Sequence, residues 1–209
     1  MFMKAPTAVH DHGKDIIIPK IAQDEQADYE GEVCIVIGKD AKDVAEADAL
    51  DYVAGYTAGN DVSARKLQSK PELAGPMPQA CFSKGFDTYA PLGPAIVSTR
   101  VIPDPTKLVL ETRVNGEVRQ TGELRDVAFS VPYLIHYLSS GTTLQKGSVI
   151  MTGTPGGKVV AFNIAISSNL TCLGVGCHLD PPQFLTPGTN VTVYVSEIGT
   201  LKNGVAHAS

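Results

Sequence analysis

Residues 28–38 read Asp-Tyr-Glu-Gly-Glu-Val-Cys-Ile-Val-Ile-Gly, and this stretch decides the fold class. The run 33–37 within it is wholly apolar and rich in β-branched side chains. Because side chains alternate between the two faces of a strand, a continuous apolar run indicates a strand that is buried on both faces. We therefore predict a central buried strand here, with polar residues at its start.

Most other elements that the sequence predicts are also strands. Asn115-Gly116 stands between two strand patterns and is a strong hairpin signal. The total Gly and Pro content, 20 and 14 residues, is typical of a turn-rich β protein. The further strand patterns lie at 52–58, 95–98, 108–114, 117–120, 148–152 and 191–195, the last of which is predicted as the terminal strand.

Helices are predicted to be few and short. Residues 131–138 place apolar side chains at i, i+3, i+4 and i+7, with Pro132 in the first turn and Gly141 beyond the end. A weaker helix pattern covers 42–50, and 67–80 is predicted as a loop because it holds three prolines. The fold class is therefore mostly β with a few short helices (α+β), in one domain over 1–209.

Composition and charge argue against two classes of function, nucleic-acid binding and membrane insertion. The chain has 209 residues and a net charge of −5, with no basic stripe, which argues against nucleic-acid binding. No apolar run approaches the roughly 20 residues of a membrane span. The start lacks a hydrophobic signal core and an Arg-rich leader, so the expected compartment is the cytoplasm, or the mitochondrion if a leader precedes the chain. The four cysteines are expected to be reduced thiols.

Three carboxylates could form a metal site. Glu30 and Glu32 are two apart, so on a strand they share one face, where they would repel each other unless a cation lay between them. Oxygen ligands of this kind favour Mg²⁺, Mn²⁺ or Ca²⁺ over zinc. Asp61 follows another strand pattern and could be a third ligand. The alternatives are two exposed acids at a solvated strand start and a helix-capping aspartate.

Two further features could bind an anion. Lys84 lies between Phe82 and Phe86, and a lysine so placed could bind an oxyanion or simply extend its ammonium to solvent. Thr152-Gly153-Thr154-Pro155 could offer backbone amides and hydroxyls to a carboxylate. This turn is not a P-loop, because the G-K-[ST] ending is missing.

In their order along the chain, seven motifs resemble those of the fumarylacetoacetate hydrolase family. The match runs over about 15–157 and resumes at 174–203, and it is closest to the small fumarylacetoacetase domain-containing subgroup. The motifs are Asp28-Tyr29-Glu30-x-Glu32, Tyr52-x-x-Gly55-Tyr56, Asn60-Asp61-x-Ser63-Ala64-Arg65, Lys84-x-Phe86-Asp87, Pro91-Leu92-Gly93-Pro94, Val114-Asn115-Gly116-Glu117 and Thr152-Gly153-Thr154-Pro155.

The resemblance implies a mixed β-roll, a homodimer, and one Mg²⁺ or similar ion (Mn²⁺ or Ca²⁺) per subunit. It implies that a small 2-oxo acid is the substrate. The residues that match the family's functional positions are the metal carboxylates Glu30, Glu32 and Asp61, the catalytic and substrate-facing Lys84, and the substrate-contacting Gln68 and Thr154.

The implied chemistry passes through an enolate. The metal would chelate the 2-oxo and carboxylate oxygens, and Lys84 would help to stabilise the enolate. The leading hypothesis is a metal-dependent hydrolase or lyase acting on an acylpyruvate or an oxaloacetate-like acid. The alternatives are a keto–enol tautomerase or decarboxylase of oxaloacetate, and a catalytically weak homologue that keeps the metal site.

The chain departs from the family pattern in three places. Family members carry an upstream lid segment with a His–Glu acid–base pair, and this chain begins after the matching point, so we assign that role to neither His10 nor His12. Residues 158–174 interrupt a family motif and are predicted to be an atypical insertion. Lys66 stands where many relatives have Asp.

Overall fold

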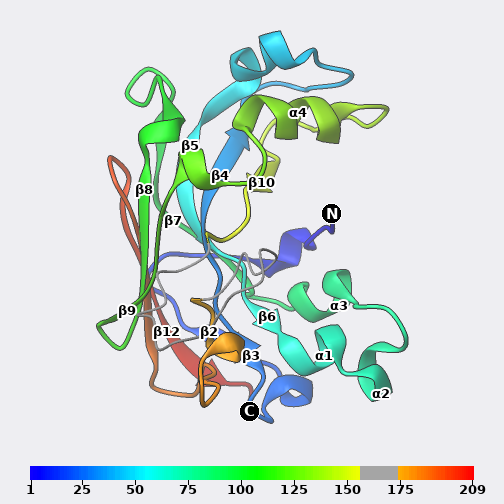
Figure 1. Cartoon of the computed structure of the whole chain (residues 1–209), viewed down its shortest axis with the longest axis vertical. Helices are drawn as coiled ribbons and strands as arrows, with labels where there is room; N and C mark the ends of the chain where they lie inside the picture. Colours follow the sequence, from blue (N-terminus) through cyan, green and yellow to red (C-terminus); the bar gives the residue numbers. More distant parts are fainter. Residues whose placement is uncertain (156–173) are drawn as a thin grey trace.

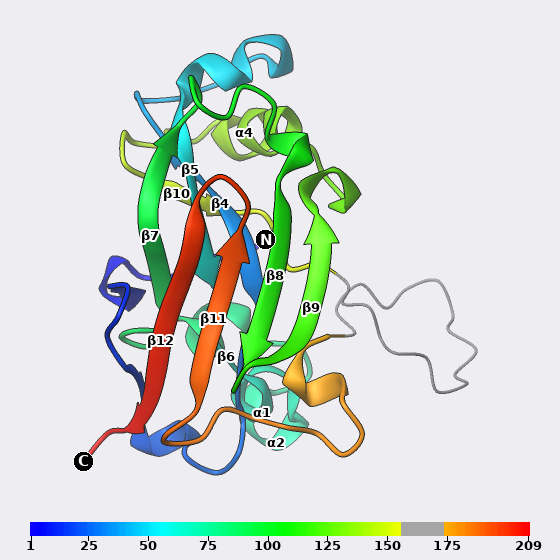
Figure 2. The same ribbon diagram turned by 90° about the vertical axis from the view of Figure 1, so that its left-hand side faces the viewer.

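A computed structural model describes residues 1–155 and 174–209, so most of the predicted insertion at 158–174 lies outside the described residues. Two five-stranded sheets face each other in this part of the chain (Figures 1 and 2). The first has the order β1 (Val9–His10), β7 (Ala90–Ser98), β5 (Val53–Asn60), β4 (Gly31–Ile37), β10 (Val149–Met151). The second has the order β2 (Ile16–Ile18), β12 (Gly199–His207), β11 (Asn190–Val195), β8 (Val109–Val114), β9 (Glu117–Glu123).

Short elements complete the fold, which is mostly β with a few short helices, as the sequence predicts. A two-stranded ribbon joins β3 (Ala27–Asp28) to β6 (Ser63–Ala64). The α-helices of the described residues are α1 (Arg65–Ser69), α2 (Pro71–Ala74), α3 (Ala80–Lys84) and α4 (Val131–Ser139). The 3₁₀ turns are η1 (Pro6–Ala8), η2 (Lys20–Ala22), η3 (Glu46–Tyr52), η4 (Pro105–Lys107), η5 (Leu124–Asp126) and η6 (Gly176–His178). No helix among the described residues has the length and apolar character needed to cross a bilayer.

The strongest sequence signals are confirmed. All seven residues of β4 are buried, and the strand pairs antiparallel with β5 on one side and β10 on the other. The β8–β9 hairpin turns at Asn115 and Gly116, whose φ angles of 50° and 84° are the left-handed values that such a turn requires. Helix α4 begins after Ser130, whose hydroxyl accepts the Tyr133 N–H.

Two predictions about elements are wrong, and a third is right only in part. The stretch 67–80 is mainly helical and not a loop: α1 and α2 occupy its first half, because Pro71 stands in the first turn of α2, where a missing N–H costs nothing. The short helix predicted at 42–50 is present as a 3₁₀ helix, but it is shifted, since η3 covers Glu46–Tyr52. The terminal strand is β12, which escaped prediction because Lys202, Asn203 and Gly204 interrupt its apolar pattern.

The core lies between the two sheets. Its larger cluster takes side chains from both sheets, among them Ile35 of β4, Tyr56 of β5 and Val193 of β11, and Ile135 of α4 covers one end. The smaller cluster packs under the β3–β6 ribbon around Tyr29 and Tyr89. Gly31 and Asn60 pair at the ends of β4 and β5, so these strand ends lie where the two buried clusters meet.

Gly55 permits the close pairing of β5 with β7. A Cβ atom at this position would lie 2.3 Å from the Val97 carbonyl oxygen and 2.8 Å from its carbon. Because those atoms belong to backbone, Gly55→Ala should force the strands apart and lower the free energy of unfolding by about 1–3 kcal/mol. Thermal melting beside Ala54→Ser, a control at an exposed neighbouring position, would test this. Equal melting temperatures for parent and Gly55→Ala would contradict it.

Candidate metal centre and substrate site

The antiparallel pairing of β4 and β5 brings three carboxylates together. Glu30 precedes β4, Glu32 lies in it, and Asp61 follows β5, where the Asp61 N–H donates to the Glu30 carbonyl at 2.8 Å. One oxygen from each of the three carboxylates lies within 4.8 Å of the others. All three residues are buried, with exposures of 8%, 3% and 2%. The sequence predicted this grouping, and the register of the two strands explains it.

Lys84 points into the carboxylate cluster from the last residue of α3. Its Nζ lies 2.8 Å from Glu30 Oε2 and 2.6 Å from Asp61 Oδ2, and the Phe2 ring centroid is 4.8 Å away. Burial lowers the pKa of Lys84, but Asp61 and Glu30 outweigh burial and raise the pKa above its ordinary value. The side chain is therefore a buried ammonium held by carboxylates, and the alternative of a solvent-extended lysine is wrong.

Two further positively charged side chains enter the cluster, and no sequence pattern assigned a role to either. Arg65 places Nε 2.8 Å from Asp28 Oδ2 and Nη2 2.6 Å from Glu30 Oε1. Lys4 places Nζ 2.6 Å from Asp61 Oδ1. Arg65 could have been found, because it follows Asp61 by four residues within a quoted motif. Lys4 could not, because 57 residues separate it from Asp61.

Asp28 anchors the backbone at Gly176 and Cys177 to this cluster. Its carboxylate accepts the N–H groups of Tyr29, Gly176 and Cys177 at 2.9, 2.7 and 3.1 Å, and it is fully buried. Such a carboxylate has its lone pairs committed to the protein. Asp28 therefore stabilises the fold beside the cluster and leaves Glu30, Glu32 and Asp61 as the candidate ligands.

Glu32 differs from the other two carboxylates. Its Oε2 accepts the Gly153 N–H at 2.8 Å, and no Lys, Arg or His of the described residues forms an ion pair with it. Burial, Asp61 and Glu30 together raise the pKa of Glu32 well above its ordinary value. A divalent cation would compensate this buried charge, and three clustered carboxylates are the hard oxygen donors that such an ion prefers. The donor set therefore fits a divalent ion.

Thr154 and Gln120 fix the backbone between the two glutamates. The Thr154 hydroxyl donates to the Gly31 carbonyl at 2.8 Å and accepts from Gln120 Nε2 at 2.6 Å. Gln120 Oε1 accepts the Gly31 N–H at 3.0 Å. Gln120 is fully buried on β9, and its role could not be predicted because a lone glutamine in a strand pattern gives no signal. The predicted substrate contact of Thr154 stays a prediction.

Gln68 lies on α1, one turn after Arg65. Its Oε1 accepts from Arg65 Nη1 at 3.1 Å, so the cluster reaches Gln68 through that guanidinium. The side chain is partly exposed, which leaves it able to meet a small molecule. Its predicted substrate contact also stays a prediction.

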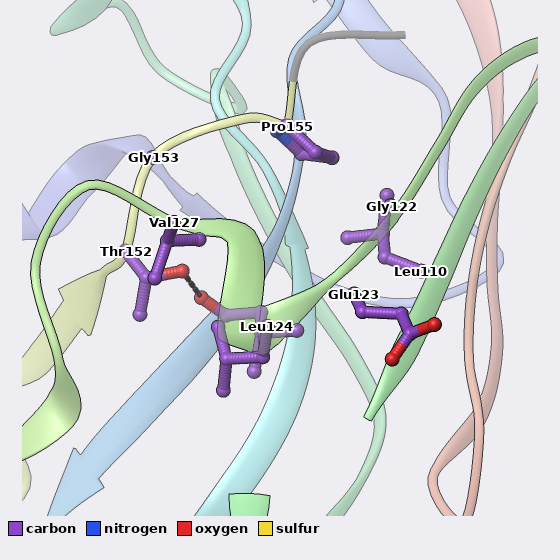
Figure 3. A pocket seen from close by; sticks show the side chains of 9 residues that line it. Leu110, Gly122, Glu123, Leu124, Val127, Thr152, Gly153 and Pro155 are labelled. Atoms are coloured by element: carbon purple, nitrogen blue, oxygen red, sulfur yellow. Dashed lines mark hydrogen bonds between the residues drawn. The ribbon is translucent and has the colours of Figure 1, made fainter. Parts of the chain in front are cut away.

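A small, mainly apolar pocket lies at the turn that contains Gly153 (Figure 3). Leu110, Leu124 and Val127 line it with Pro155 and the Thr152–Gly153 turn. Since none of Glu30, Glu32, Asp61 or Lys84 lines this pocket, it is separate from the cluster. The pocket is lined by Gly153, whose N–H donates to Glu32, so it lies against the turn that holds this carboxylate.

The raised pKa of Glu32 predicts how stability depends on pH in the absence of divalent ions. Between the ordinary pKa in the unfolded chain and the raised pKa in the folded one, the folded state holds the extra proton. The free energy of unfolding should therefore fall as pH rises through this window, from about 4.5 upward. Glu32→Gln should flatten that decline, as melting in EDTA at several pH values would show.

The exposed Glu46→Gln is the control for this measurement, and its pH dependence should match that of the parent. An equally steep decline in Glu32→Gln and parent would contradict the assignment of the decline to Glu32.

Comparisons with known proteins agree with the predicted family. Residues 1–206 match the family model described as fumarylacetoacetate (FAA) hydrolase, C-terminal. The chain is 40% identical over 205 residues, 98% of its length and 60% of the relative's, to the oxaloacetate tautomerase YisK of Bacillus subtilis. It is 48% identical over 157 residues, 75% of its length and 58% of the relative's, to an uncharacterized protein of Archaeoglobus fulgidus. The chain thus spans about three fifths of these two relatives.

Solved structures show the same fold. Fumarylacetoacetate hydrolase from Exiguobacterium antarcticum superposes with a TM-score of 0.81 at 36% identity, over 98% of this chain and 65% of that one. A 5-carboxymethyl-2-hydroxymuconate delta-isomerase from Mycobacterium smegmatis gives a TM-score of 0.78 at 35% identity, over 99% of this chain and 68% of that one. The family match, the relatives and the shared fold agree, and the chain belongs to the fumarylacetoacetate hydrolase family.

Proposed function

We propose that this protein is a divalent-metal-dependent enzyme that acts on a small 2-oxo acid through its enolate form. Glu30, Glu32 and Asp61 would hold the ion, with Mg²⁺ as the first candidate and Mn²⁺ or Ca²⁺ as alternatives. The observation that carries the proposal is the buried ammonium of Lys84, bound by Glu30 and Asp61 beside a carboxylate that lacks a cationic partner among the described residues.

A bound divalent ion would polarise the 2-oxo and carboxylate oxygens of the substrate, as a Lewis acid does. Lys84 would donate to the oxygen on which negative charge develops when a proton leaves the neighbouring carbon. Glu30 and Asp61 hold the Lys84 side chain in place and keep it protonated, so the group needs no reorganisation during the reaction. Gln68 and Thr154 would contact the substrate, and a homodimer is the proposed assembly.

Keto–enol tautomerisation of an oxaloacetate-like acid is the first candidate reaction. It needs stabilisation of one enolate, which the ion and Lys84 could supply, and a base that takes the proton from carbon, for which a water molecule is the candidate because Lys84 is held as an ammonium. The 40% identity to a protein named oxaloacetate tautomerase supports this choice. Hydrolytic C–C cleavage of an acylpyruvate is the second candidate, supported by the likeness to fumarylacetoacetate hydrolase, and it requires an activated water in addition.

A substrate panel tests the proposal. Oxaloacetate, acetylpyruvate and fumarylacetoacetate would each be mixed with the protein in Mg²⁺ and in EDTA, while enol absorbance, CO₂ release and cleavage products are followed. Mg²⁺-dependent loss of enol absorbance without CO₂ or cleavage identifies a tautomerase. Cleavage products identify the hydrolase, and CO₂ identifies a decarboxylase. Activity that is equal in EDTA and Mg²⁺ would refute metal dependence.

A further inference from the structure

Lys4 reaches the cluster from a segment that is distant in sequence. The start of the chain runs beside α3 and the ends of the central strands (Figure 1). Lys4 Nζ lies 2.6 Å from Asp61 Oδ1 and 3.1 Å from the Val62 carbonyl, and its side chain is 9% exposed. Burial lowers the pKa of Lys4, and Asp61 opposes that shift. The ion pair with Asp61 makes Lys4 a buried ammonium, and the proposed reaction assigns it no role.

The charges of the cluster show what Lys4 could contribute. Four carboxylates face three cations, so the cluster has one more negative than positive charge; its members are Asp28, Glu30, Glu32, Asp61, Lys4, Arg65 and Lys84. A divalent ion at the three candidate ligands would make the cluster net positive by one. Without Lys4, the same loaded cluster would be neutral.

We propose that Lys4 sets the charge of the ion-loaded site, so that the site favours an anionic 2-oxo acid, while Lys4 itself weakens binding of the cation. This inference rests on the proposed metal site and adds a residue to it. Lys4 would act on the substrate indirectly, through its charge, because its contacts are to Asp61 and Val62. Lys84 remains the group that is proposed to face the substrate.

Holding Asp61 in place does not require Lys4. The Asp61 N–H donates to the Glu30 carbonyl at 2.8 Å, and Lys84 binds the other carboxylate oxygen at 2.6 Å. A purely structural role for Lys4 would make its loss weaken cation and anion binding together. A charge role predicts opposite changes, since removing a positive charge favours the cation and disfavours the anion.

Titration calorimetry with two probes distinguishes these roles. For Lys4→Met, we expect Mg²⁺ to bind about tenfold more tightly and oxalate to bind the Mg²⁺-loaded protein about tenfold more weakly, which is the scale for one partly buried charge a few ångströms away. Lys4→Arg keeps the charge and should retain both parental affinities within about threefold. Lys20→Met, at an exposed position, should change neither affinity.

Other outcomes would overturn the inference. Parallel weakening of Mg²⁺ and oxalate binding by Lys4→Met would identify a structural role, and unchanged oxalate affinity would exclude the charge role. If Lys4→Met does not fold, Lys4→Gln removes the charge, retains a donor for Asp61, and carries the same expectations. A parent that binds no Mg²⁺ would refute the proposed function together with this inference, whereas normal parental binding with unshifted variants would refute the inference alone.

Discussion

Lys84→Met is expected to lower turnover of an oxaloacetate-like substrate by about 10²–10³-fold, the usual effect of losing one donor to a developing oxyanion. Methionine keeps an unbranched side chain as far as Cε and removes the charged Nζ. The lost group lies 2.8 Å from Glu30 and 2.6 Å from Asp61, inside the cluster and not at its rim. Loss of enol absorbance with saturating Mg²⁺ would measure the effect, with the exposed Lys70→Met as the control.

The same substitution should also reveal the structural contribution of Lys84. Without divalent ions, Glu30 and Asp61 would lose a buried partner, and an uncompensated buried charge is strongly destabilising. We therefore expect a lower melting temperature in EDTA that Mg²⁺ largely restores. Parental turnover in a Lys84→Met protein that binds Mg²⁺ normally would refute the assigned role, because folding and ion binding would then be intact.

The sequence predicts the central features of the site because they depend on local periodicity. Strand alternation places Glu30 and Glu32 on one face, and pairing of consecutive strands brings Asp61 beside them. Prediction fails where tertiary contacts decide. Lys4 joins Asp61 across 57 residues, and Gln120 joins the Gly31 backbone across 89. Neither pair has a fixed spacing that a sequence pattern could report.

The errors in the fold have similar causes. The loop prediction for 67–80 counted three prolines without considering where each one stands. Pro71 occupies the first turn of α2, where a proline is compatible with a helix. β12 is held by pairing with β11 and β2 despite its polar residues, so its neighbours stabilise it more than its own pattern does. The short helices α1 and α3 matter for function, since they position Arg65 and Lys84.

Glu32→Gln is expected to weaken Mg²⁺ binding by about 100-fold or more, since it removes the charge of one of three candidate ligands. Glutamine keeps the shape of the side chain, and its carbonyl oxygen can still accept the Gly153 N–H. The fold should therefore survive, and in EDTA at neutral pH the variant should melt at or above the parental temperature, because a buried carboxylate has been neutralised. Calorimetric titration with Mg²⁺ measures the affinity.

Glu46→Gln, which changes an exposed glutamate of η3, should keep parental Mg²⁺ affinity. Undiminished Mg²⁺ affinity in Glu32→Gln would show that Glu32 is no ligand and would leave its burial unexplained.

Glu32→Gln and Lys84→Met can be compared directly, because the two variants change the cluster charge in opposite directions. Removing the carboxylate should strongly weaken ion binding and leave the metal-free fold stable, whereas removing the ammonium should spare ion binding and destabilise the metal-free fold. Only a cluster built to receive a divalent cation predicts both results.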